Sequence, residues 1–158
     1  MNDGFVVRAG RSEAVDSPPH LITLLADGTA TAGAFSITRV DLRPGFDGAA
    51  PHLHTGFSEL LYVISGSVQV LSGEHTAIAA AGDLVVVPPS VPHAFGALAD
   101  AGASLLTVIG PGIDRFQYFR DLAAAANGDV PGLRPGTPER YDSQLVDSPA
   151  WRRARLGE

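Results

Sequence analysis

Four side chains of the sequence have the types and spacing of a metal site. His52 and His54 are separated by one residue, and in an extended segment such residues point to the same side. They can therefore present two imidazoles to one point. Glu59 opens an apolar run shortly afterwards, and His93 opens a later one. Three imidazoles and one carboxylate suit one divalent transition metal ion per chain, namely Fe, Mn, Ni, Co, Cu or Zn.

Other reactive groups are scarce in this chain of 158 residues. It contains no Cys, which excludes thiol nucleophiles, disulfides and Cys-ligated clusters. Its 11 basic residues are all arginine, so a Schiff-base lysine and a P-loop are excluded as well. A bound metal ion is therefore the main source of reactivity that the sequence offers.

The elements that must position these side chains are predicted to be short strands. With 18 Gly and 12 Pro, the chain shows about nine or ten apolar runs, separated by turns at spacings of about 8 to 12 residues. We therefore predict an all-β, antiparallel fold in which Gly45–Pro51 is a loop and Ser65-Gly66 a turn. The predicted strands are Phe5–Arg8, Leu21–Ala26, Ala34–Leu42, Glu59–Ile64, Val68–Leu71, Thr76–Ala80, Leu84–Val87, His93–Leu98 and Ser104–Ile109.

The pattern changes after residue 112, where a helix is predicted over Arg115–Ala126. Phe116, Phe119 and Ala123 share one face of that helix, which we expect to pack on the barrel. A short terminal helix is expected around Ala150–Leu156. The predicted organisation is N-terminal strands that complete the barrel (1–33), a barrel core (34–111) and a C-terminal helix with a tail (112–158).

The spacing of the candidate ligands resembles the two sequence motifs of the cupin superfamily. The residues that carry the resemblance are, in the first motif, His52, His54, Glu59 and Gly66 and, in the second, Gly82, Pro88 and His93. The chain departs from the pattern at Gly45, which stands one residue early, and at Ser90 and Ala97, which replace Gly and Asn.

The resemblance implies a single-domain cupin. Its fold would be an antiparallel double-stranded β-helix, the jelly-roll or cupin barrel, here with a C-terminal α-helix. The resemblance also implies that the metal ligands are His52, His54, Glu59 and His93. Four such ligands would leave two positions of an octahedral ion open for a substrate, or for a substrate and dioxygen.

Strand alternation predicts a largely apolar substrate pocket around the metal. The predicted pocket residues are Phe57, Leu61, Val63, Val68, Val70 and Phe95. Arg115 and Tyr118, near the start of the helix, are expected to be structural, with a cover over one barrel mouth as the alternative. His20 and His75 fit no ligand spacing.

Resemblance to the cupin-type quercetin (flavonol) dioxygenases predicts a metal-dependent dioxygenase that acts on a small oxygenated aromatic compound. Glu59 is the predicted catalytic residue, because a carboxylate can stay bound, swing off or take a proton. One alternative is a non-redox cyclase or isomerase acting on a polyketide-type or keto substrate. Another is a small-molecule-binding cupin without catalysis.

Charge and hydropathy predict the remaining partners and the compartment. The net charge is −6, and the basic residues cluster only at Arg152, Arg153 and Arg155, so we expect no nucleic acid as a partner. No apolar run approaches the roughly 18 residues of a membrane helix, and the N-terminus does not resemble a signal peptide. These features predict a cytoplasmic protein without a membrane partner.

The predicted strand Glu59–Ile64 is apolar on both faces, since Leu60, Tyr62 and Ile64 alternate with the inward side chains. Its outer face must be covered, either by the C-terminal helix or by a second subunit. Because the resemblance also supports a dimer, we predict a homodimer.

Overall fold

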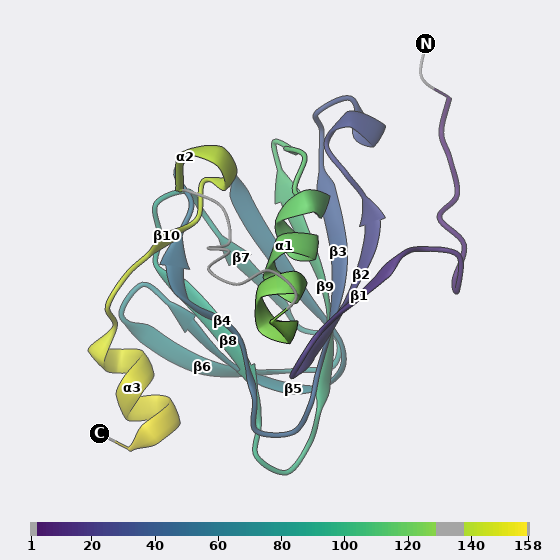
Figure 1. Ribbon diagram of the computed structural model, residues 1–158. Helices are drawn as coiled ribbons and strands as arrows, with labels where there is room; N and C mark the ends of the chain where they lie inside the picture. Colours follow the sequence, from purple (N-terminus) through teal and green to yellow (C-terminus); the bar gives the residue numbers. More distant parts are fainter. Residues whose placement is uncertain (1–2, 129–137, 158) are drawn as a thin grey trace.

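One antiparallel sheet curls so that its two halves face each other in the computed structural model, which describes residues 3–128 and 138–157 (Figure 1). The strands are β1 (Ala14–Ser17), β2 (His20–Ala26), β3 (Ser36–Leu42), β4 (Asp47–Leu53), β5 (Ser58–Ser72), β6 (His75–Ala80), β7 (Leu84–Val87), β8 (His93–Ala97), β9 (Ala103–Gly110) and β10 (Gln144–Leu145). The helices are α1 (Phe116–Asn127), α2 (Pro138–Tyr141) and α3 (Pro149–Leu156), with a 3-10 turn at Thr29–Thr31. The predicted all-β antiparallel barrel with a C-terminal helix is confirmed.

The longest strand, β5, joins the two halves. Its first part pairs with β7 and β9, and its second part pairs with β6 and β8. Gly66 lies between the parts with φ 73°, and a Cβ there would stand 2.0 Å from the carbonyl oxygen of Gly102. The predicted turn at Ser65-Gly66 is therefore wrong, because the chain bends at this glycine without reversing.

Two further sequence predictions fail at the edges of the sheet. Phe5–Arg8 forms no strand and is exposed, whereas Ala14–Ser17 finds a partner in β2 and becomes the first strand. Gly45–Pro51 was predicted to be a loop, yet Asp47–Leu53 forms β4 and pairs with β8. The register of that pair shifts at Gly48 and again at Pro51, so the strand accommodates two residues that are unfavourable in a regular strand.

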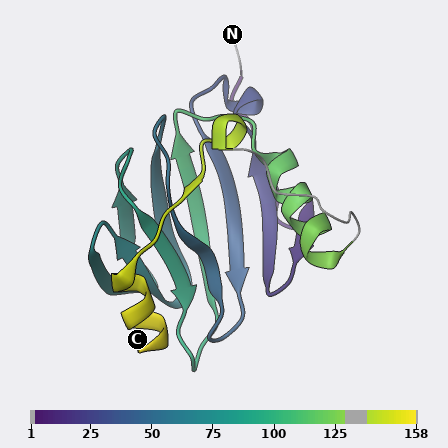
Figure 2. The ribbon, with the colours of Figure 1, turned by 60° about the vertical axis from the view of Figure 1, so that its left-hand side comes forward.

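Helix α1 packs beside the open side of the barrel, against β1 (Figures 1 and 2). Phe116, Phe119 and Ala123 contact buried aliphatic side chains of β1 and β2, so the predicted packing face is confirmed. The last residue of the helix is Asn127. Gly128 follows it with φ 74°, a left-handed conformation that ends the helix. Among the described residues, no helix has the length and apolar character needed to span a membrane.

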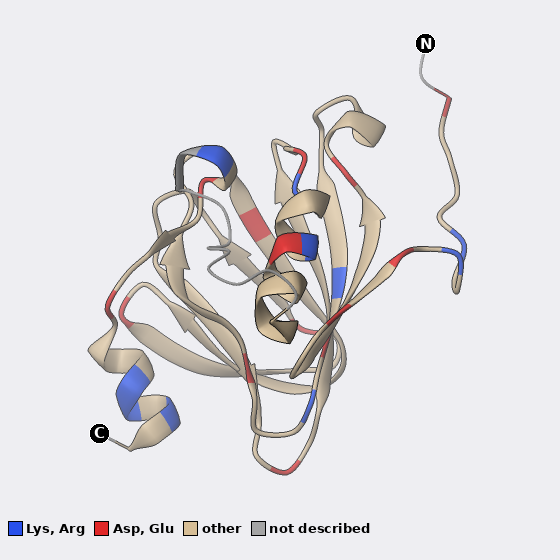
Figure 3. Cartoon of the chain, viewed as in Figure 1, with Lys and Arg blue, Asp and Glu red and all other residues tan. Residues whose placement is uncertain are grey.

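The C-terminal segment is tied back onto the barrel. β10 pairs with β4, and Trp151 of α3 packs against Leu71 and Ala94. Arg155 forms an ion pair with Asp47, with 2.7 Å between Nε and Oδ1. The arginines of the C-terminus thus lie on α3, against the edge of the barrel, and at least one of them is structural (Figure 3).

Candidate metal centre

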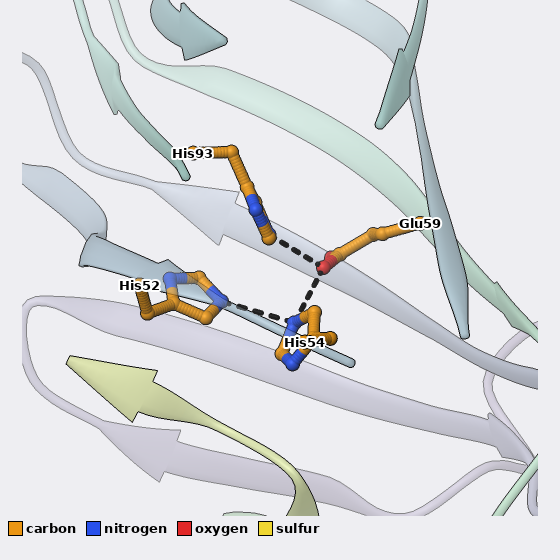
Figure 4. Close-up of side chains that lie close together, drawn as sticks. All are labelled: His52, His54, Glu59 and His93. Carbon is orange, nitrogen blue, oxygen red and sulfur yellow. Dashed lines mark hydrogen bonds and ion pairs between the residues drawn. The ribbon is translucent and has the colours of Figure 1, made fainter. Parts of the chain in front are cut away.

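The four candidate ligands converge in the barrel interior (Figure 4). His52 lies on β4, His54 follows that strand, Glu59 lies on β5 and His93 begins β8. The β4–β8 register places His52 directly opposite His93. All four side chains are buried, and their candidate ligand atoms lie within 4.8 Å of one another. The strand pairing thus brings together residues that are up to 41 positions apart in the chain.

Backbone carbonyls fix the orientation of all three imidazoles. Nδ1 of His52 lies 2.8 Å from the carbonyl oxygen of Ala50, and Nδ1 of His93 lies 3.0 Å from that of Val91. Nδ1 of His54 contacts the carbonyl oxygen of Asp142. Because a carbonyl only accepts, each Nδ1 donates, and in a neutral ring Nε2 then carries the lone pair.

When all three imidazoles are neutral, their inner faces form a set of acceptors without donors. Nε2 of His52 lies 3.1 Å from Nε2 of His54, and Oε2 of Glu59 lies 3.1 Å from His54 Nε2 and 3.0 Å from His93 Nε2. Lone pairs at such distances repel one another unless a cation lies between them. The donor set therefore fits a transition metal ion, held by three Nε2 atoms and one carboxylate.

Two of the candidate ligands, His52 and Glu59, have protonation states that suit metal binding. Burial, followed by the charge of His93, lowers the pKa of His52 to about 4, so this imidazole is neutral near pH 7. Burial alone would raise the pKa of Glu59, but hydrogen bonds from His54 and His93, which form when a proton takes the place of the metal ion, outweigh it and hold that pKa well below its usual range. A neutral imidazole and an ionised carboxylate are ready to bind without releasing protons.

Asp142 holds the loop between His54 and Glu59. Its carboxylate accepts hydrogen bonds from the backbone N of Thr55 at 2.8 Å and of Gly56 at 2.6 Å, and from the Thr55 hydroxyl at 2.8 Å. Sequence analysis missed this residue. No local pattern marks it, because it lies 88 positions from the histidine that it orients.

A cavity of about 510 Å³ lies between the barrel and α1, with His52 and Glu59 on its wall. Its lining is mostly apolar, with the aromatic side chains Phe95, Phe116, Tyr118 and Phe119. Hydroxyl groups on its wall come from Ser36, Thr38 and Thr107, among others. Such a cavity suits a small molecule with a flat apolar body and a few oxygen atoms.

The predicted pocket residues separate into two groups. Phe95 lines the cavity, and Gly48 leaves room for it, since a Cβ on Gly48 would lie 2.1 Å from the Phe95 ring. Phe57 is buried against the candidate ligands, with its ring centroid 4.3 Å from that of His54, and is not among the described residues that line the cavity. The aliphatic members pack in the barrel core and are not among the described residues that line the cavity: Leu61, Val63, Val68 and Val70.

The two other histidines lie outside the ligand cluster, as their spacing indicates. His75 is exposed at the start of β6, and His20 lies on the cavity wall with its ring nitrogens on the carbonyl oxygens of Ser17 and Asp47. His75 is therefore a matched control for the ligands.

Replacement of a ligand tests the metal centre. We expect His93→Ala to lose the metal ion, while the His75→Ala control keeps about one ion per chain, because only His93 faces the other ligands. Elemental analysis of both purified variants beside the wild type measures this. Equal metal content in the two variants would contradict the assignment.

Replacement of Asp142 tests how the loop is positioned. We expect Asp142→Ala to weaken metal binding by about 10- to 100-fold, because groups that orient metal ligands have effects of that size. Competition with a chelating dye gives the affinity, and Asp147→Ala, in the same segment but exposed, serves as the control. An affinity within about threefold of the wild type, a change too small for such a role, would show that the carboxylate does not position the site.

Comparison with known proteins adds to this geometry. The family described as Cupin domain matches residues 38–109, which include all four candidate ligands. No curated protein matches the chain. Among solved structures, KdgF from Halomonas sp. is 20% identical with a TM-score of 0.61, and the alignment covers 69% of this chain and 94% of that one.

Two further solved structures show the same barrel. An RmlC-like cupin from Shewanella frigidimarina is 22% identical with a TM-score of 0.58, over 71% of this chain and 96% of that one. A predicted oxalate decarboxylase from Thermotoga maritima is 20% identical with a TM-score of 0.60, over 67% of this chain and 98% of that one. At this level of identity the likeness concerns the fold. The family match over residues 38–109, which is less than half of the chain, and the shared barrel thus agree in showing a cupin fold.

Proposed function

We propose that this chain is a metal-dependent dioxygenase that acts on a small oxygenated aromatic compound. The observation that carries the proposal is that two members of the four-residue cluster, His52 and Glu59, lie on the wall of a mostly apolar and aromatic-lined cavity. The cavity, of about 510 Å³, has the size of a small-molecule site. The similarity to flavonol dioxygenases stays a prediction that this geometry supports.

A bound transition metal ion would supply Lewis acidity and, if redox-active, electron exchange with dioxygen. In a dioxygenation both oxygen atoms enter the product and the substrate supplies all the electrons, so no separate reductant is needed. His52, His54 and His93 would hold the ion through Nε2. Glu59 would be the fourth ligand, and its carboxylate lies on the cavity wall, where on leaving the ion it could accept a hydroxyl proton from a phenol or an enol.

A polar part of the cavity wall favours a second candidate function. The hydroxyl groups of Thr38 and Thr107 are buried on the cavity wall and lie 2.6 Å apart, so one donates to the other, and the one that accepts can donate to a keto or hydroxyl group. Such a wall suits a non-redox cyclase or isomerase acting on a polyketide-type or keto substrate. The third candidate function is the binding of a small molecule without catalysis.

Oxygen uptake distinguishes these functions. We expect protein reconstituted with Fe, Mn, Ni or Co to consume one O₂ per molecule of flavonol or catechol converted, because both oxygen atoms enter the product. An oxygen electrode and chromatography of the products measure the ratio, with His93→Ala as the control. Conversion without oxygen uptake would overturn the dioxygenase in favour of the cyclase or isomerase, and binding without conversion would leave a binding protein.

We also infer that a second copy of the chain covers the outer face of β5 and β7. Tyr62, Leu84 and Val86 are 43%, 56% and 55% exposed on that face. The register pairs Tyr62 with Leu84, so these side chains form one continuous apolar surface. Helices α1 and α3 pack elsewhere: α1 contacts β1, and α3 contacts β6 and the second part of β5, near Leu71. A homodimer would bury this surface.

A charge on that face should separate the subunits. We expect wild-type protein to show twice the chain mass of 16.4 kDa and Leu84→Asp to show the single mass, because a buried unpaired carboxylate opposes association. Size-exclusion chromatography with light scattering measures the mass. Ile78→Asp, which charges an exposed apolar residue on β6, is the control and should stay dimeric. A monomeric wild type, or a dimeric Leu84→Asp variant, would contradict the inference.

A further inference from the structure

Arg115 is a buried cation on the wall of the cavity. It is only 7% exposed, and it lines the cavity together with His52 and Glu59. Its Nε has no hydrogen-bond partner, and the ion pairs of residues 3–128 and 138–157 do not include it. A guanidinium carries five N–H donors and no acceptor, so leaving it buried without a partner is costly.

The surroundings of Arg115 hold it in place without satisfying its donors. Its Cζ lies 5.5 Å from the ring centroid of Phe57, 5.2 Å from that of Tyr118 and 5.6 Å from that of Phe119. These ring faces stabilise the positive charge but offer no oxygen acceptor. The backbone is fixed as well, because the Asp27 carboxylate accepts from the backbone N of Arg115 at 2.7 Å. The guanidinium is therefore preorganised for a ligand.

The charges around the cavity favour an anionic ligand. Glu59 contributes one negative charge, whereas a divalent metal ion and Arg115 together would contribute three positive ones. Asp27 also lines the cavity and adds a second negative charge, which the backbone amides of Arg115 and Phe116 stabilise, so one positive charge would remain in excess. In a mostly apolar cavity this positive excess acts on a ligand more strongly than it would in water.

We propose that Arg115 is an anion subsite that binds a carboxylate of the substrate, while the metal centre binds its hydroxyl or keto oxygens. The planar guanidinium matches a carboxylate through two parallel hydrogen bonds. The substrate is then an oxygenated aromatic acid rather than a neutral compound. The aromatic part of this inference rests on the proposed function, whereas the anion subsite rests on Arg115 itself.

Binding of matched acids and amides tests the subsite. The probes are 2,3- and 3,4-dihydroxybenzoate and their amides, which differ by one charge, titrated calorimetrically into Zn-loaded protein. For at least one isomer we expect the wild type to bind the acid about 10- to 100-fold more tightly than the amide, the usual effect of a charge-assisted pair. We expect Arg115→Gln to lose this preference through weaker acid binding, with amide affinity within about threefold, since the neutral amide forms no ion pair.

A second arginine of the same helix provides the control. Arg120 lies at the surface of α1, where it pairs with Glu13, so Arg120→Gln should keep the preference for the acid. Equal affinity of the wild type for acid and amide in both isomers would overturn the subsite. So would an equal loss of acid and amide affinity in Arg115→Gln, because a structural role would affect both probes alike.

A second substitution at Arg115 keeps the test valid if Arg115→Gln does not fold. Should far-UV circular dichroism show that Arg115→Gln is unfolded, Arg115→Lys replaces it, since Lys keeps the charge but not the two parallel hydrogen bonds. Acid affinity should then fall about tenfold with amide affinity unchanged, and an equal change in both would overturn the subsite. Oxygen uptake does not enter this test, so its outcome is separate from that of the dioxygenase proposal.

Discussion

Four acceptor groups held together inside a barrel repel one another unless a cation lies between them. This constraint organises the centre, where three imidazole Nε2 atoms and one carboxylate face the same point. Backbone carbonyls on the outer side of the imidazole rings fix this arrangement. Each accepts a hydrogen bond from Nδ1, so that the lone pair of Nε2 points inward. The β4–β8 register and the start of β5 then bring the groups to their mutual distances. A shift of either strand by one residue would turn a ligand away from the cavity.

The segments outside the barrel core complete the site. Asp142, in the C-terminal segment, orients His54 through its carbonyl and holds the loop toward Glu59 through its carboxylate. Helix α1 closes the open side of the barrel with aromatic side chains and brings Arg115 to the cavity wall. The chain after residue 112, which in the sequence resembles a helix with a tail, thus contributes both to ligand geometry and to the ligand-binding surface.

Two positive centres of different kinds meet in the cavity. A metal ion among the four ligands would be a compact charge that polarises oxygen atoms, whereas Arg115 is a planar group that recognises the shape of an oxyanion. The apolar and aromatic walls between them exclude water and strengthen both interactions. A substrate that spans the two centres would be fixed in one orientation, which is what a selective reaction at one of its oxygen atoms requires.

The sequence by itself determined the strand-rich fold and the packing face of α1, because local periodicity encodes these features, and its resemblance to the cupin motifs indicated the four candidate ligands. It failed where a conformation depends on a distant partner: Gly66 bends β5 instead of ending it, and Asp47–Leu53 is a strand because β8 lies beside it. Only the tertiary structure showed that Val68 and Val70 fill the core while Arg115 and Tyr118 line the cavity. Alternation gives the side of a strand on which a residue lies, but depth in the barrel and the position of α1 follow from contacts between residues far apart in the chain.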